Sequence, residues 1–196
     1  MTGLSSQDII LAGVGGQGIL SIAFIIDSAA LREGFNIKQA EVHGMAQRGG
    51  AVQSHLRVSR SPIWSDLIPR GRADLILSVE PLEALRYLDY LRPDGIVVTS
   101  STPYRNIPDY PDVAKVLEAI RRAPRSVVVD AEKLAKEAGT VKAQNIVLLG
   151  AAAPSLILKE AGLLRTIEEL FRVRGTPVLE ANLKAFELGK KAALGS

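Results

Sequence analysis

Six residues near the N-terminus, Gly13-Val14-Gly15-Gly16-Gln17-Gly18, have the spacing G-x-G-x-x-G that is typical of phosphate-binding loops. They follow the apolar run Ile9–Ala12 and precede a segment with helical spacing, which is where such a loop must lie. Glycines let the backbone approach a phosphate, and the free N–H groups at the start of a helix attract its charge. The motif therefore predicts a phosphate site, with tight strand–helix packing as the alternative role. A Walker A loop is excluded because no Lys-Ser/Thr pair follows.

A complete dinucleotide site would need an acidic residue near the end of the second strand, about 20 residues further on, to bind the ribose. Glu41 is the candidate, but His43-Gly44 follows it instead of an ordinary crossover. A stand-alone, Rossmann-type nucleotide-binding reductase is therefore one functional hypothesis for this chain.

A second group of polar residues lies between glycines in the segment 41–50. Arg48 offers a planar guanidinium for a phosphate or a carboxylate, and Gly49 and Gly50 leave the backbone beside it open. His43 can exchange a proton near neutral pH, although a histidine in a turn also serves as a hydrogen-bonded structural residue. If the two loops end neighbouring strands, they form one crevice. The candidate binding residues are then Gly13, Gly15, Gly16, Gln17, Gly18, His43, Arg48, Gly49 and Gly50, with no catalytic or metal-ligating residue among them.

The elements that must position these loops alternate along the first two thirds of the chain. Apolar runs predict strands at 9–12, 35–42, 51–58, 75–79, 96–99 and 126–129. Helical spacing predicts helices at 16–32, 81–91, 113–122, 131–138, 143–161, 166–173 and 177–193. This order indicates one domain of the α/β class, a three-layer α/β/α Rossmann-like fold. We expect residues 1–130 to form the α/β core and 131–196 a mainly helical C-terminal region.

Two segments are candidate contact surfaces. The strand at 51–58 alternates apolar and polar residues, so we expect an edge strand covered by a partner. The proline-rich loop around 104–111 is the other candidate.

The composition excludes several functions. The chain has 196 residues and no cysteine, so it cannot hold an iron–sulfur cluster through thiolates, use a thiol nucleophile or form a disulfide. Its net charge of +3 and its 5% aromatic content do not resemble a nucleic-acid-binding surface. Glycines and Pro154 interrupt the two longest uncharged stretches, which argues against membrane spans. With no secretory signal in residues 1–8, we expect a cytoplasmic protein.

Several motifs together resemble a known family. Gly13–Gly18 followed by Arg48-Gly49-Gly50 is similar to the gamma-type subunit or domain of thiamine-dependent 2-oxoacid:ferredoxin oxidoreductases. The segments 40–50, 78–85, 145–150 and 180–189 are most similar to the beta subunit of the indolepyruvate branch. The resemblance extends over about residues 7–192.

The resemblance implies a complex that decarboxylates an arylpyruvate on thiamine diphosphate, passes electrons through iron–sulfur clusters to ferredoxin, and transfers the acyl group to coenzyme A. The Gly-Asp-Gly…Asn signature for thiamine diphosphate and magnesium is absent here, with Pro93-Asp94-Gly95 the nearest match. We therefore expect a large alpha subunit to carry thiamine diphosphate, magnesium and the clusters. This chain is then a subunit without the catalytic centre, inactive alone, and it reaches ferredoxin only through the complex.

The resemblance also suggests a role for the crevice. We expect Gly15–Gly18 and Arg48–Gly50 to face a phosphate of coenzyme A or the partner's active site, with Gln17 and His43 adding polar contacts. No cofactor is expected to bind firmly to this chain. A purely structural docking subunit, and a homodimer of the isolated chain, are the alternatives; neither nucleic acid nor a membrane is an expected partner.

Overall fold

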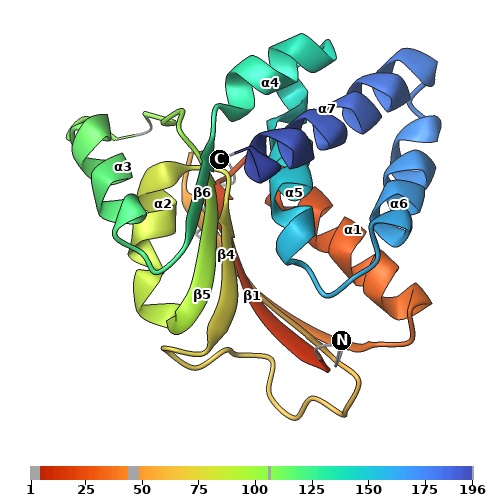
Figure 1. The fold of residues 1–196 in the computed structure, drawn as a ribbon, viewed down its shortest axis with the longest axis horizontal. Helices are drawn as coiled ribbons and strands as arrows, with labels where there is room; N and C mark the ends of the chain where they lie inside the picture. The colour runs from red at the N-terminus through yellow and green to blue at the C-terminus, as the bar shows by residue number, and fades with distance from the viewer. Residues whose placement is uncertain (1–4, 44–48, 106, 196) are drawn as a thin grey trace.

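The chain folds around one mixed six-stranded sheet (Figure 1). The structure, a computed structural model, describes residues 5–43, 49–105 and 107–195, with His43 described in its backbone only. The strands are β1 Ser6–Val14, β2 Asn36–His43, β3 Ala51–Ser59, β4 Ala73–Ser78, β5 Leu91–Ser100 and β6 Ser126–Val129. Their order is β2-β3-β1-β4-β5-β6. The strands β1, β4, β5 and β6 are parallel to one another, and β3 is antiparallel to both of its neighbours.

Helices cover both faces of the sheet, so the predicted three-layer α/β fold is confirmed. The helices are α1 Ile19–Arg32, α2 Pro81–Arg86, α3 Val113–Arg121, α4 Ala131–Ala138, α5 Gln144–Ala152, α6 Glu160–Arg172 and α7 Thr176–Leu194. On one face, Ile10, Ile76 and Val97 pack under α2 and α3. On the other face, Ile9 and Leu11 pack under α1 and the C-terminal helices. Figure 1 shows these two groups of helices on opposite sides of the strands.

The predicted helix at 143–161 is wrong. The helix α5 ends at Ala152, a short 3-10 turn follows at Ala153–Ser155, and the next helix begins only at Glu160. Pro154 lacks the N–H group that would continue an α-helix, and Leu156 is already extended. The helix predicted at 166–173 is the second half of α6.

The prediction that 51–58 is an edge strand is also wrong. The strand β3 lies between β2 and β1, and Ser54 is paired with Glu41 on one side and Leu11 on the other. Its two buried polar residues are hydrogen-bonded: Ser54 Oγ accepts from Gln39 Nε2 at 3.0 Å, and His55 Nδ1 accepts the Ile68 N–H at 3.0 Å. Burial lowers the pKa of His55. At Ser54 and His55 the polar alternation therefore reflects internal hydrogen bonding, and the edge strands of the sheet are β2 and β6.

The C-terminal helices are held together by a close crossing of α5 and α7. A Cβ atom on Gly150 would lie 2.0 Å from the Phe186 carbonyl oxygen, and one on Gly189 would lie 1.9 Å from that of Val147. Only glycine permits this approach of the two backbones. The crossing places the first turns of both helices beside the carboxyl ends of the parallel strands. Within the described residues, none of the helices is long and apolar enough to cross a bilayer.

Candidate functional site

A cavity of about 830 Å³ lies at the carboxyl edge of the sheet. Here β1 and β4 are parallel neighbours, and the chain leaves them toward opposite edges, which makes this the topological switch point where α/β folds bind ligands. The glycine loop and Val79, which follows β4, line one side of the cavity. Its volume is in the usual range for small-molecule sites. The carboxyl edge is therefore the candidate functional site.

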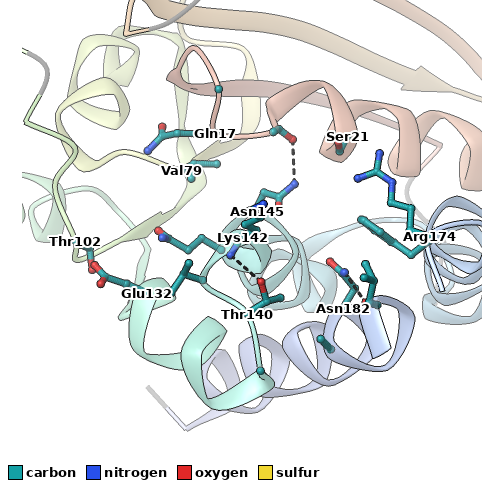
Figure 2. A pocket seen from close by; sticks show the side chains of 18 of the residues that line it. Gln17, Ser21, Val79, Thr102, Glu132, Thr140, Lys142, Asn145, Arg174 and Asn182 are labelled. Carbon is teal, nitrogen blue, oxygen red and sulfur yellow. Dashed lines mark hydrogen bonds between the residues drawn. The ribbon is translucent and has the colours of Figure 1, made fainter. Parts of the chain in front are cut away.

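The glycine loop is shaped by two side-chain amides. Gly18 adopts φ +78° directly before α1, and the Asn145 side chain donates a hydrogen bond from Nδ2 to the Gly18 carbonyl at 3.2 Å. A Cβ atom on Gly18 would lie 2.5 Å from that same nitrogen. Gln17 Oε1 accepts the Val14 N–H at 2.8 Å, so this oxygen closes the loop and does not face a ligand. Figure 2 shows Asn145 between the loop and the C-terminal helices.

The two predicted glycine segments lie against each other. The Gly15 N–H donates to the Gly50 carbonyl at 2.8 Å, and the Gly49 N–H donates to the Gly15 carbonyl at 3.3 Å. These bonds occupy the Gly15 N–H, so it is not available to a phosphate. Of the predicted residues that the structure describes, Gly16, Gln17 and Gly18 line the cavity, whereas Gly13, Gly15, Gly49 and Gly50 do not. The His43 side chain and all of Arg48 lie outside the described residues.

The geometry does not support a classical dinucleotide site. In that fold the second strand is the parallel neighbour of the first, which brings its acidic residue to the ribose. Here β3 separates β2 from β1, and Glu41 lies two strand spacings, about 10 Å, from β1. The expected ribose-binding role of Glu41 is therefore not met.

The opposite wall of the cavity comes from the C-terminal helices, where sequence reasoning placed no site residue. Lys142, Asn145, Arg174 and Asn182 line this wall. In Figure 2 the Arg174 side chain extends from the segment between α6 and α7 toward Ser21 in the first turn of α1. The only available signal was the segment 145–150, which carried part of the family resemblance.

Three helix starts give the cavity a positive field. In the part of the chain that the structure describes, α1 and α7 begin with neither a side-chain cap nor an acidic residue in the first turn. Helix α5 also has no acid in its first turn, but it continues directly from the 3-10 turn Val141–Ala143, which the Thr140 side chain caps by accepting the Lys142 N–H at 3.3 Å. Residues of all three first turns line the cavity. Uncapped N–H groups favour an anion, and Lys142 and Arg174 add two full charges. The acidic lining residue, Glu132, is paired with Lys136.

A buried glutamate positions the loop that forms the remaining side. Glu80 is 1% exposed and caps α2 by accepting the Glu83 N–H at 2.8 Å. It also accepts hydrogen bonds from the Tyr104 N–H, at 3.3 Å, and from the Tyr110 hydroxyl. Burial and the Glu80 carboxylate raise the pKa of Tyr110. Glu80 thus holds the proline-rich loop, whose residues Thr102–Tyr104 line the cavity.

Comparison with known proteins places the chain in a family. A sequence model described as "Pyruvate ferredoxin/flavodoxin oxidoreductase" matches residues 8–192. The chain therefore belongs to the pyruvate ferredoxin/flavodoxin oxidoreductase family, and the predicted resemblance is confirmed.

Within this family, the chain is 38% identical to the indolepyruvate oxidoreductase subunit IorB of Thermococcus kodakarensis, over 97% of each chain. The prediction of an oxidoreductase subunit is confirmed by this similarity to known subunits.

Two other relatives contain the same unit within longer chains. The ketoisovalerate oxidoreductase subunit VorA of Methanothermobacter thermautotrophicus is 26% identical, over 93% of this chain and 35% of its own. A solved structure of 2-oxoglutarate:ferredoxin oxidoreductase from Magnetococcus marinus, with 2-oxoglutarate, coenzyme A and succinyl-CoA bound, has a TM-score of 0.78 at 23% identity. It covers 98% of this chain, whereas this chain spans 32% of that one. In both relatives the unit is about a third of a larger polypeptide.

Proposed function

We propose that the chain is the subunit without the catalytic centre in an indolepyruvate-type 2-oxoacid:ferredoxin oxidoreductase, and that its cavity receives coenzyme A. The observation that carries the proposal is the convergence of three helix starts without an acid in the first turn, those of α1, α5 and α7, with Lys142 and Arg174 on one cavity at the switch point. Coenzyme A is anionic at its nucleotide end and carries a thiol at the end of a long arm. A cavity with a positive field suits the phosphates of the nucleotide end.

This chain then performs binding and positioning. With the nucleotide end held at the cavity, the arm and its thiol are free to extend into a companion subunit. The large alpha subunit, which receives the arylpyruvate and reduces ferredoxin, must provide thiamine diphosphate, magnesium and iron–sulfur clusters. Thiolate-held clusters do not fit this chain, because it has no cysteine.

Arg48 extends the proposed site. Its neighbours Gly49 and Gly50 are hydrogen-bonded to the glycine loop through Gly15. A guanidinium in this segment makes a bidentate contact with a phosphate or with an acidic group of the companion, so Arg48→Lys should lose it as fully as Arg48→Ala. The roles of Arg48 and His43, the cytoplasmic location and the contact with ferredoxin stay predictions.

Isothermal titration of the purified chain with coenzyme A, NADH and NADPH tests the proposal. We expect binding of coenzyme A, and a loss of roughly 10-fold or more in Arg174→Ala and Lys142→Ala, since a charge-assisted contact contributes about 1.5–3 kcal/mol. Lys115→Ala and Arg121→Ala, which remove exposed cations from α3, are the matched controls and should bind normally.

Three results would contradict the proposal. Equal affinity for coenzyme A in all four variants would show that the cavity is not its site. Tight binding of NADH in place of coenzyme A would instead favour the stand-alone reductase. If the chain binds none of the three yet assembles with its companion, it is a purely structural docking subunit.

A further inference from the structure

Helix α1 exposes a line of large apolar side chains. Leu20, Phe24 and Leu31 are 55%, 53% and 63% exposed. Phe35, Phe171 and Phe186, the remaining phenylalanines, are each less than 10% exposed, so Phe24 is an exception in this chain. No other helix in the described ranges exposes three large apolar residues. Single exposed apolar residues are ordinary, whereas a contiguous line of them marks an interaction surface.

The spacing along this line is that of a helix–helix seam. Residues 20, 24, 27 and 31 are separated by four, three and four positions, the a/d pattern that places side chains along one stripe facing a second helix. The opposite side of α1 is already packed on the sheet through Ile22 and Ile26, which are 1% and 0% exposed. Helix α1 therefore has two apolar faces, and the outer one has no partner in the described chain.

Asp27 is the polar member of the seam. Its Oδ1 atom is buried and has no hydrogen-bond partner among the described residues. Burial raises the pKa of Asp27 to about 6. A carboxyl group left without donors is costly. Because Oδ1 is enclosed by this chain, a donor from outside can reach the carboxyl group only at the part of the half-buried side chain that is exposed. A single polar residue in an apolar seam also sets the register of the two helices.

We infer that the outer face of α1 docks an amphipathic helix of the companion subunit, one that carries a hydrogen-bond donor opposite Asp27. The inference rests on the proposed function. In VorA and in the Magnetococcus marinus enzyme the matching unit is about a third of one longer chain, so peptide bonds keep the remainder beside it. A separate chain of this length must be held by surface contacts, and the seam is the surface suited to that contact.

A second copy of this chain does not complement the seam. Two parallel α1 helices related by a two-fold axis would place Asp27 against Asp27. An antiparallel pair would place Asp27 against Phe24. The parallel pair sets two carboxyl groups against each other, which can share one proton but repel when both are ionised, and the antiparallel pair offers only an apolar ring. A different chain with a permanent donor therefore complements the seam better.

The seam continues directly into the cavity. Leu20 is adjacent to Ser21, which lines the cavity, and α1 begins at the glycine loop. A companion helix laid along the seam would end at the mouth of the cavity and complete its wall. Docking and ligand binding would then meet at the first turn of α1.

The test uses the complex of this chain with its co-expressed companion. We expect Phe24→Asp to weaken the association of the two chains by about 100-fold or more, measured by titration of one labelled chain with the other. Asp27→Leu, which removes the acceptor, should weaken it about 10-fold, whereas Asp27→Asn, which keeps an acceptor, should weaken it less. Val173→Asp places the same charge at a residue that is 86% exposed and lies outside the seam, and it should associate normally.

Circular dichroism and thermal melting must show that each variant is folded. If the Phe24→Asp chain does not fold, Leu20→Ser provides a second and milder variant of the seam. If a folded Phe24→Asp chain assembles as tightly as the wild type, the inference about the seam is wrong, while the proposed function is not affected. A wild-type dimer that dissociates in Phe24→Asp also overturns it, because the seam is then a self-association surface. If the wild-type chain does not assemble with the companion at all, the proposed function itself fails.

Discussion

Two sets of helix starts in this molecule differ in their chemistry. The helices α2, α3 and α4 begin at acidic side chains, Glu80, Asp112 and Asp130, each of which accepts hydrogen bonds from backbone N–H groups of the first turn. The helices α1, α5 and α7 begin at Gly18, Ala143 and Gly175, and their described first turns contain no acid. First-turn residues of all three helices in the second set line the cavity, whereas the first set contributes, among the described residues, only Glu132 of α4, which is paired with Lys136.

The difference shows that the helix starts at the cavity lack stabilising interactions that the other helix starts have. A side-chain cap contributes about 1 kcal/mol, so the missing caps of α1 and α7 are a substantial cost to a domain of this size. Their uncapped N–H groups make the cavity attractive to an anion, and the carboxylate in the described lining, that of Glu132, is paired with Lys136. Regions that break a local rule in this manner are expected at functional sites.

The largest expected effect on stability comes from forcing apart α5 and α7, two of the helices that line the cavity. Gly189→Ala would place a Cβ atom 1.9 Å from the Val147 carbonyl oxygen, so α5 and α7 must move apart. We expect a loss of about 3 kcal/mol in the free energy of unfolding, measured by urea denaturation. Gly162→Ala in α6 is the control, because its Cβ meets a side-chain oxygen of Glu33 at 3.2 Å and Ala29 Cβ at 3.4 Å, and its nearest backbone contact outside α6, Ala29 Cα, is at 3.8 Å. The control should remain within about 0.5 kcal/mol of the wild type; equal losses would show that the crossing is not tight.

A smaller effect is expected at the glycine loop. Gly18→Ala combines a strained positive φ with a contact of 2.5 Å to Asn145 Nδ2. Gly71→Ala has nearly the same strain, with φ +72°, but nothing within 4 Å. We expect about 2–3 kcal/mol of destabilisation for Gly18→Ala and about 1 kcal/mol for Gly71→Ala. Only Gly18→Ala should also lose affinity for coenzyme A; equal effects of the two substitutions would mean that Asn145 does not shape the loop.

The comparison can be broken by giving a cavity helix the acid it lacks. Gln144→Glu adds a carboxylate to the first turn of α5, where it should stabilise the helix by about 0.3–1 kcal/mol. The same charge should lower the affinity for coenzyme A about 10-fold, because it repels the phosphates. Ala114→Glu adds an acid to the first turn of α3 and should leave this affinity unchanged. If Gln144→Glu binds coenzyme A with unchanged affinity, the start of α5 does not contact the ligand.

The opposite test removes the side-chain cap of α3, a helix that does not line the cavity. The Asp112 carboxylate accepts the N–H groups of Ala114 and Lys115 at 2.8 and 3.2 Å. Asp112→Ala should lower the free energy of unfolding by about 1 kcal/mol and leave coenzyme A binding intact. Asp109→Ala, in the exposed loop before it, should change neither quantity.

The smallest expected effect is the pH dependence of stability that comes from Asp27, whose buried Oδ1 has no hydrogen-bond donor among the described residues. The folded-state pKa of Asp27 is about 6, above its usual value of 3.8, so the fold binds this proton more tightly than the unfolded chain. The contribution to stability is fully present below pH 4 and is lost as the pH rises through 6. Because the residue is partly exposed, we expect about 1 kcal/mol or less. Unfolding measured from pH 4 to 7 should show this decline in the wild-type chain and a flatter profile in Asp27→Asn.

The sequence by itself determined the layers of the fold and the family. Apolar runs such as Ile9–Ala12 and the helical spacing after Gly18 depend on neighbouring residues, so their patterns are visible without a structure. The position of the glycine loop between β1 and α1 was predictable for the same reason. The absence of cysteine removed iron–sulfur chemistry from this chain through composition alone.

The tertiary structure alone decided the cavity. Asn145 shapes the loop at Gly18 although 127 residues separate the two, and Lys142 and Arg174 reach the same cavity only because α5 crosses α7 at Gly150 and Gly189. The insertion of β3 between β2 and β1, which displaced Glu41, likewise depends on which strands pair. Such contacts arise between segments far apart in the chain, and periodicity and capping, which act over a few residues, contain no information about them.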